Sequence, residues 1–326
     1  MKKIRIGIIG AGWITRQHLQ VIQNIRHIKV EGITSRTMEK ARKLAHQFHI
    51  PICVKSLSSL INKTNLDALM VLVSADQTFK VTSHALTFGL PVFIEKPAGL
   101  TPRENLSLVR LAKKYSTKTM VGFNRRYYSI FHKGINIIQK HGPLFGVTIE
   151  GHERIWNIKK NKKFSKKILN HWIYANNIHM IDLCRFFGGE PKKIIALSRR
   201  FSEYHGDQFS ALFTFSRQMT GIYNAHWYSP GGWRVVLYGN GVTVEFNPLE
   251  KGLWIDKNLK KHFIQPAPED LNFKPGFFRQ MKAFYQLILG NKDPYLQGLE
   301  GAYKSMVLAK TLCKNIENIK NIPKKI

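Results

Sequence analysis

Cysteine is scarce in this chain of 326 residues, with only Cys53, Cys184 and Cys313 present and far apart. An odd number of widely spaced cysteines provides neither a disulfide framework nor the paired spacing of a zinc site. No apolar run is long enough to cross a bilayer, and no segment repeats at a fixed period. We therefore expect a cytoplasmic protein without a bound metal and without a membrane partner.

The first residues, "MKKIRIGIIG", are basic and then apolar, as in a signal peptide. Polar, helical "TRQHL" follows closely, and no small-residue cleavage site intervenes. We expect this segment to be a first strand and its turn rather than a targeting sequence.

Acidic residues are also few: 20 Asp and Glu face 51 Lys and Arg, for a net charge of +31. Such an excess can indicate a nucleic-acid partner. The lysines, however, are spread along the whole chain beside many Asn and Ile, a usage typical of an AT-rich genome. The one dense run, residues 159–167, contains Phe164 as its single aromatic side chain for base stacking. We favour a solvated loop here over a basic flap across an anionic substrate, and we expect no nucleic-acid partner.

A hydrophobic content of 44% is enough for one or two globular domains with real cores. Up to residue 121, apolar runs alternate with segments of helical spacing, which predicts a parallel, doubly wound sheet. The expected strands lie within residues 3–9, 28–36, 66–74, 91–97 and 119–124.

The pattern changes in residues 122–326, which we assign to a second domain. A helix over 127–142, a strand from 144 and a helix over 172–189 precede several strands joined by short turns. Neighbouring strands with short connections predict a mostly antiparallel sheet. The chain from about residue 275 is predicted to be helical, and it could pack back on the first domain.

A glycine-rich turn, Gly10-Ala11-Gly12-Trp13-Ile14-Thr15, follows the first expected strand and opens a helix. It matches G-x-G-x-x-G except that Thr15 replaces the third glycine. Gly10 permits the tight turn, and Gly12 lets a pyrophosphate approach the helix N-terminus. We predict that Gly10, Gly12, Trp13 and Ile14 bind a dinucleotide; the alternative is a plain strand–helix turn.

The end of the second expected strand carries Ser35-Arg36-Thr37. A site that prefers NAD usually has Asp or Glu there, which would repel a 2′-phosphate. Ser35 and Arg36 would instead bind that phosphate, so the sequence favours NADP, with NAD still possible. The alternative is a helix cap followed by an exposed arginine.

The apolar run 92–94 ends abruptly in Glu95, Lys96 and Pro97. The carboxyl end of a parallel strand is where such sheets bind ligands. We expect Ser74, Glu95 and Lys96 to contact the cofactor; a solvated loop lysine is the alternative for Lys96.

Four segments occur in an order and spacing that resemble the glucose–fructose oxidoreductase / inositol dehydrogenase (Gfo/Idh/MocA) family: "GIIGAGW", "EKPAG", "GFNRRY" and "NIHMIDL". The resemblance covers nearly the whole chain. It implies a Rossmann domain followed by an α/β domain with an open, mostly antiparallel sheet, whose far face often forms a dimer. It also implies NAD(P)-dependent oxidation or reduction of a sugar, cyclitol or nucleotide-sugar alcohol, for which surface polysaccharide biosynthesis is a common setting. We accordingly expect a small-molecule substrate and a homo-oligomer, a dimer or a tetramer.

The same resemblance assigns catalytic roles to Lys96 and His179. The family's lysine lies beside the nicotinamide and the substrate, and its Lys–Pro bond is often cis. His179 matches the histidine of an Asp-x-x-x-His pattern, a general base, but Ala175 stands where the aspartate is expected. Either the base is weaker, or another acid such as Glu153 supports it, or Lys96 takes a larger share of different redox chemistry.

Four residues are candidates for binding the substrate. Trp172 and Asn176 share the helix face of His179, and Asn176 could hydrogen-bond to it. Asn124 and Arg125 follow the fifth expected strand, where an arginine could bind a carboxylate or phosphate. Because Ala175 breaks the pattern, a dinucleotide-binding sensor or partner subunit that has lost the base is the competing interpretation.

Overall fold

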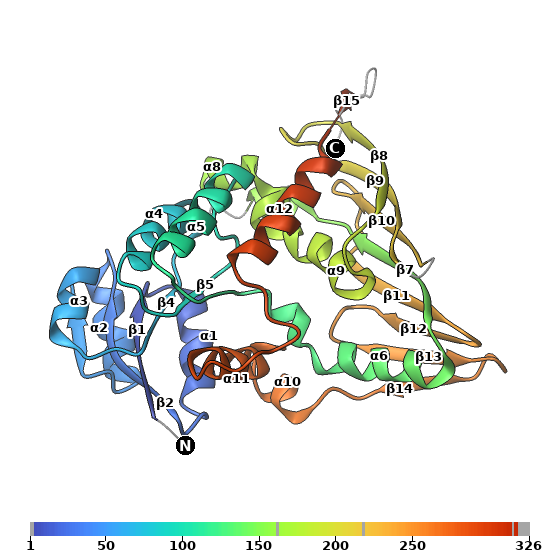
Figure 1. Ribbon diagram of the computed structural model, residues 1–326. Helices are drawn as coiled ribbons and strands as arrows, with labels where there is room; N and C mark the ends of the chain where they lie inside the picture. The colour runs from blue at the N-terminus through green and yellow to red at the C-terminus, as the bar shows by residue number, and fades with distance from the viewer. Residues whose placement is uncertain (1–2, 161–162, 217–218, 315, 319–326) are drawn as a thin grey trace. The chain divides into compact units, whose positions relative to one another are not determined.

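The chain forms two compact units in the computed structural model, which describes residues 3–160, 163–216, 219–314 and 316–318 (Figure 1). The first unit combines Met1–Tyr127 with Pro268–Lys304, and the second combines Tyr128–Ala267 with Ser305–Ile326. The chain passes from the first unit to the second a last time within α12 (Leu299–Leu312).

In the first unit, six strands of the described residues pair in parallel in the order β3-β2-β1-β4-β5-β6. They are β1 (Ile4–Ile9), β2 (Ile28–Thr34), β3 (Ile52–Val54), β4 (Ala68–Val71), β5 (Val92–Ile94) and β6 (Thr119–Val121). The order reverses between β1 and β4, which places a ligand crevice outside the carboxyl ends of these strands. This sheet confirms the predicted doubly wound fold.

Helices cover both faces of the parallel sheet. They are α1 (Trp13–Ile22), α2 (Met38–Gln47), α3 (Leu57–Lys63), α4 (Ala75–Leu86), α5 (Pro102–Lys114) and α11 (Phe277–Ile288). The short helix α10 (Pro268–Asn272) contacts α11. In Figure 1, α4 and α5 lie over one face, and α1 and α11 lie over the other. Phe277 and Phe284 of α11 join the core formed by Ile6, Ile8 and Phe93, so a segment from late in the chain completes this unit.

The pair β3 and α3 is absent from the elements expected from the sequence. β3 has only three residues, "ICV", between Pro51 and Lys55. A run this short has no readable periodicity, and its pairing with Gly32–Thr34 of β2 is what defines it as a strand.

The second unit is built on a sheet in the order β14-β13-β12-β11-β7-β10-β9-β8-β15 among the described residues. Its strands are β7 (Leu144–Gly151), β8 (Lys193–Arg200), β9 (Gln208–Thr214), β10 (Thr220–His226), β11 (Trp233–Gly239), β12 (Val242–Phe246), β13 (Gly252–Asp256), β14 (Lys261–Ile264) and β15 (Glu317–Asn318). The pairs β7–β10 and β8–β15 are parallel, and the other neighbours are antiparallel. The predicted mostly antiparallel sheet is confirmed.

One face of this sheet is covered by α6 (Ser129–His141) and α9 (Ile178–Gly188) (Figure 1). The short helices α7 (Ile155–Lys160) and α8 (Lys166–Asn170) lead to a π-helical turn, Ile173–Asn177, directly before α9. Single π-turns are frequent at functional sites, and this one interrupts the continuous helix expected over 172–189. Within the described part of the chain, no helix has both the length and the apolar character needed to cross a lipid bilayer.

Candidate active site

The glycine-rich turn joins β1 to α1 in the first unit. Gly10 has a φ of +116°, and a Cβ at this position would lie 2.2 Å from the carbonyl oxygen of Leu72. Gly12 is the N-cap of α1, and a Cβ built on it would meet nothing within 4 Å. The backbone therefore requires glycine at position 10, whereas Gly12 leaves open space over the helix terminus.

The N-terminus of α1 is suited to an anion. Its first turn contains no acidic side chain, and its N-cap residue, Gly12, has no side chain that could cap the helix. The helix dipole and the N–H groups of the first turn therefore favour negative charge. The hydroxyl of the fully buried Thr15 donates to the carbonyl of Gly10 over 3.1 Å. The side chain that replaces the third glycine thus closes the turn, while Trp13 is 65% exposed beside it and Ile14 packs on the core.

Lys274 is a residue beside this turn that the sequence analysis missed. Its Nζ lies 4.7 Å from the ring centroid of Trp13 and 4.8 Å from that of Phe277. It precedes α11 and is far from the glycine turn in sequence, so no local pattern could reveal it. A cation here adds to the positive potential at the N-terminus of α1.

The end of β2 presents a hydroxyl and a guanidinium. Ser35 is half-buried and its Oγ accepts the N–H of Thr37 over 3.2 Å, while Arg36 is exposed. Thr37 is the N-cap of α2, as the sequence suggested, but its side chain makes no capping hydrogen bond. Sites that prefer NAD present a carboxylate at the end of this strand, and here there is no carboxylate at Ser35, Arg36 or Thr37.

Ser74 lies at the same edge of the sheet, since it follows β4, the neighbour of β1. It is the N-cap of α4, and its hydroxyl donates to Asp76 Oδ1 over 2.7 Å. The predicted cofactor residues of β1, β2, β4 and β5 are thus all at the carboxyl ends of parallel strands.

The charged turn after β5 is folded around the carboxylate of Glu95. Glu95 is only 7% exposed, and its Oε2 accepts the backbone N–H of Lys96 over 3.0 Å. The Lys96–Pro97 peptide bond is cis. Farther along, the hydroxyl of Thr101 accepts the N–H of Glu104 over 3.1 Å, which begins α5. Lys96 itself is half-buried at the ligand edge of the sheet.

The second unit contains a pocket of about 560 Å³ next to β7 and the π-turn. Its lining includes Glu153, Arg154, Phe164, Trp172, Asn176 and Trp233. The rings of Phe164 and Trp172 meet edge to face with centroids 5.1 Å apart. The predicted substrate residues Trp172 and Asn176 therefore line one cavity, together with a second tryptophan.

A buried carboxylate lies at this pocket. Glu153 is 5% exposed, and its Oε1 accepts the side-chain amides of Asn176 over 3.1 Å and Asn177 over 3.2 Å. Asn177 also donates to the carbonyl of Gly151 over 2.8 Å, and its Oδ1 accepts the hydroxyl of the fully buried Tyr223. The π-turn thus holds Glu153 in a fixed orientation through two successive asparagines.

His179 stands in the first turn of α9 and is 4% exposed. Its ring centroid is 6.2 Å from that of Trp233, which lines the pocket. Ala175 lies in the π-turn, 6% exposed, and contributes no carboxylate. The buried acid of this pocket is Glu153, which comes from the strand side rather than from the helix.

Two family models match the chain. A model described as an oxidoreductase family with an NAD-binding Rossmann fold matches residues 4–123, and the GFO/IDH/MocA C-terminal domain matches residues 142–245. The chain belongs to the Gfo/Idh/MocA family of oxidoreductases. The NAD-binding Rossmann assignment agrees with the open space at Gly12 and the acid-free N-terminus of α1.

Several Gfo/Idh/MocA relatives are dehydrogenases. The inositol 2-dehydrogenase of Acidothermus cellulolyticus is 30% identical over 227 residues, which covers 68% of this chain and 64% of that protein. The glucose-6-phosphate 3-dehydrogenase of Bacillus subtilis is 27% identical over 199 residues, 56% of this chain and 53% of that protein. In both, the match spans less than two thirds of the relative's length. An oxidoreductase from Thermotoga maritima shares the fold over 96% of both chains, with a TM-score of 0.80 and 20% identity.

Asn124 and Arg125, the other predicted substrate residues, lie in the first unit in a 3-10 helix, Asn124–Tyr127. Asn124 is 3% exposed and its amide donates to the carbonyl of Pro275 over 3.0 Å. Arg125 donates to Asn124 Oδ1 over 3.4 Å. Asn124 therefore ties this helix to the segment before α11, and a role for either residue toward substrate stays a prediction.

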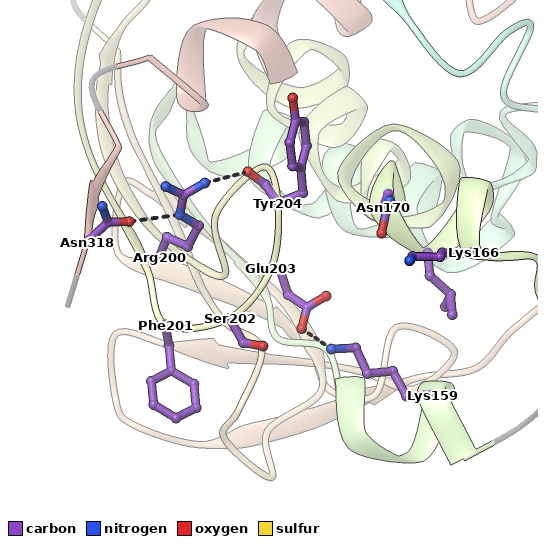
Figure 2. A pocket seen from close by; sticks show the side chains of 10 residues that line it. Lys159, Lys166, Asn170, Arg200, Phe201, Ser202, Glu203, Tyr204 and Asn318 are labelled. Carbon is purple, nitrogen blue, oxygen red and sulfur yellow. Dashed lines mark hydrogen bonds and ion pairs between the residues drawn. The ribbon is translucent and has the colours of Figure 1, made fainter. Parts of the chain in front are cut away.

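Part of the lysine run lines a second pocket, of about 690 Å³, that borders α7 and α8 (Figure 2). Lys159 donates to Glu203 Oε1 over 2.5 Å, and Arg200 donates to Asn318 Oδ1 over 2.8 Å. Glu203 is buried and also accepts the hydroxyl of Tyr228 over 2.7 Å. Lys159 offsets the charge of Glu203, so Lys166 and Arg200 leave this pocket with an excess of positive charge; residues 161–162 of the run lie outside the described residues.

Proposed function

We propose that this protein is an NAD(P)-dependent dehydrogenase or reductase that acts on a CH–OH or keto group of a sugar or nucleotide-sugar derivative. The observation that carries the proposal is the pocket of the second unit, where Trp172 and Trp233 accompany Glu153 and Asn176. Aromatic faces pack against the C–H faces of a sugar ring, and a buried carboxylate and amide suit its hydroxyls.

The proposed cofactor is NADP. The glycine turn and the N-terminus of α1 would hold the pyrophosphate, and the nicotinamide ring supplies the hydride acceptor or donor when bound. Ser35 and Arg36 support NADP over NAD, because a hydroxyl and a guanidinium would bind a 2′-phosphate that a carboxylate would repel.

Lys96 and His179 carry the proposed proton chemistry. His179 exchanges the proton of the substrate hydroxyl as general base or acid, and Lys96 positions or polarises that oxygen. Because Ala175 supplies no carboxylate, Glu153 is the acid that organises this pocket, through Asn176 and by accepting a second substrate hydroxyl.

The second pocket supports a substrate that carries an anionic group. Lys166 and Arg200 line it, and α7 borders both pockets, since Lys159 lines this one and Asn157 and Ile158 line the first. The proposed substrate places its phosphoryl group here and its sugar in the first pocket. A nucleotide sugar used for surface polysaccharides in the cytoplasm carries such a group. Arg125, in the first unit, is a separate candidate for binding an anion.

The proposed partner is a second copy of the chain. Ile195, Leu212 and Ile222 are paired across β8, β9 and β10, and their side chains are 57%, 55% and 45% exposed. They lie on the face opposite α9, because the alternate residues of β9 and β10 are buried. An apolar row of this kind is typical of an interface rather than of a solvated sheet.

A dinucleotide-binding sensor or partner subunit is the second candidate function, and Ala175 is the observation that favours it. The two functions are separated by titrating NADPH and NADH by fluorescence and then assaying turnover on a panel of sugars, sugar phosphates and nucleotide sugars. We expect NADPH binding and turnover that Lys96→Ala and His179→Ala abolish. Cofactor binding without any turnover would support the sensor function. If the protein bound neither NADPH nor NADH, both candidate functions would be excluded.

A further inference from the structure

A fully buried histidine contacts the turn of residues 95–97 that follows β5. Nε2 of His18, on α1, lies 3.0 Å from Oε1 of Glu95. The other carboxylate oxygen of Glu95 accepts the backbone N–H of Lys96 over 3.0 Å. A continuous series of contacts therefore runs from α1 through one carboxylate to the peptide group of Lys96.

We propose that His18 is a positioning residue for the reaction: it fixes the Glu95 carboxylate, which in turn fixes the backbone that presents Lys96. This inference rests on the proposed function, because it assigns the network a task in catalysis by Lys96. His18 acts through Glu95 and is not itself assigned to substrate or cofactor.

The surroundings of His18 restrict the plane of its ring. It stacks on Phe277 with centroids 4.5 Å apart and an interplanar angle of 25°, and it meets Phe93 edge to face at 5.1 Å. Both aromatic rings belong to the core, so the imidazole is clamped from two sides.

The other ring nitrogen of His18, Nδ1, indicates that the residue does more than fill space in the core. Nδ1 of His18 is buried and has no hydrogen-bond partner among the described residues. An unsatisfied buried polar atom costs about 1–3 kcal/mol, which an apolar side chain of similar size would avoid. The histidine is therefore explained by what its other nitrogen binds, which is Glu95.

The carboxylate of Glu95 also packs on β6 and lies in a positive environment. A Cβ on Gly122, which follows β6, would lie 3.1 Å from Oε1 of Glu95, so the carboxylate packs directly on that backbone. Burial raises the pKa of Glu95, but the hydrogen bond and charge of His18 and the charges of Lys96 and Lys274 outweigh it and lower the pKa. The carboxylate stays ionised at neutral pH and accepts from both His18 and Lys96.

Loss of the His18 contact would release the carboxylate and let the Lys96 turn shift. A displacement of about 1 Å at a catalytic group can cost about 100-fold in rate. The effect should fall on kcat, because the groups assigned to substrate binding are left in place.

The test compares His18→Leu, which removes the hydrogen bond, with His18→Gln, whose amide N–H can replace Nε2 as donor. Val21→Ala, a core substitution on the same helix, is the control for lost stability. We expect kcat to fall about 100-fold in His18→Leu with KM nearly unchanged, most of it to return in His18→Gln, and none to be lost in Val21→Ala. Equal activity of the Leu and Gln variants would overturn the inference.

Crystal structures of the two His18 variants provide a readout that does not depend on turnover. The Lys96 turn should be displaced in His18→Leu and retained in His18→Gln; an unmoved turn in His18→Leu would contradict the inference. If the wild-type protein turns over no substrate, the proposed function fails. The crystal structures then still show whether His18 and Glu95 hold the Lys96 turn in place.

Discussion

The side-chain amide of Asn176 donates to Oε1 of Glu153 over 3.1 Å, and so links the π-turn before α9 to the end of β7. The residue before Asn176 is Ala175, where the family pattern has an aspartate. The carboxylate that lines this pocket belongs to Glu153, and we propose that it takes over part of the role of the absent aspartate.

Glu153→Gln should weaken substrate binding. A hydrogen bond to an ionised carboxylate is worth about 1.5–3 kcal/mol, which corresponds to about a 10- to 100-fold increase in KM. Steady-state kinetics with the best substrate from the panel measure it. The matched control is Glu245→Gln, which removes a carboxylate of β12 that pairs with Arg234 of β11. It should leave KM unchanged. An unaltered KM in Glu153→Gln would mean that the substrate does not use this carboxylate.

Two alanine substitutions in the glycine turn should have different effects. Gly10→Ala places a Cβ 2.2 Å from the Leu72 carbonyl at a φ of +116°, so we expect a loss of stability of at least about 1–3 kcal/mol. Gly12→Ala has open space around its Cβ, so the protein should fold normally but bind the dinucleotide weakly. Thermal unfolding and fluorescence titration separate the two effects. Normal NADPH affinity in Gly12→Ala would place the pyrophosphate elsewhere.

Arg36→Ala should lower the affinity for NADPH about tenfold or more and leave that for NADH unchanged, because a charge-assisted contact to the 2′-phosphate is lost. Lys43→Ala, which removes an exposed cation farther along α2, controls for the general loss of positive charge. Titration of both cofactors against both variants checks this. Equal losses for NADPH and NADH would contradict the assignment.

Much of the parallel sheet and the glycine turn could be predicted, because each signal is local: apolar runs, turn glycines and helical spacing. The pairing of His18 with Glu95 could not, since the two residues are far apart in sequence and a histidine among apolar residues has no local signature. Lys274 was missed for the same reason. The π-turn at Ile173–Asn177 also escaped prediction, because the spacing around Ala175 is compatible with an ordinary helix.

The stability contributed by Glu95 should depend on pH. Its pKa in the folded protein lies below the ordinary value of 4.5, so the ionised carboxylate stabilises the fold above about pH 4.5, and this contribution is lost as the pH falls through the lowered pKa. The difference in free energy of unfolding between wild type and Glu95→Gln should be largest near neutral pH and shrink below about pH 4.5. Urea unfolding at several pH values measures it, and a difference that grows on acidification would contradict a stabilising role of the ionised carboxylate.

Leu212→Lys should disrupt self-association, because it places a charge in the centre of the exposed apolar row on β8, β9 and β10. Light scattering after size-exclusion chromatography should give the mass of a dimer or tetramer for wild type and of a monomer for the variant. Leu259→Lys, at a highly exposed position outside that row, is the control. A monomeric wild-type protein would remove the proposed interface.

The most direct test of the central claim follows the hydride itself. The protein is incubated with NADPH deuterated at nicotinamide C4, in each of the two stereochemical forms, and with oxidised members of the sugar panel, and the products are examined by mass spectrometry. The account predicts that one form transfers a single deuterium to the new carbinol carbon, and that Lys96→Ala and His179→Ala transfer none in the same time. Tight NADPH binding with no deuterium in any product would contradict it.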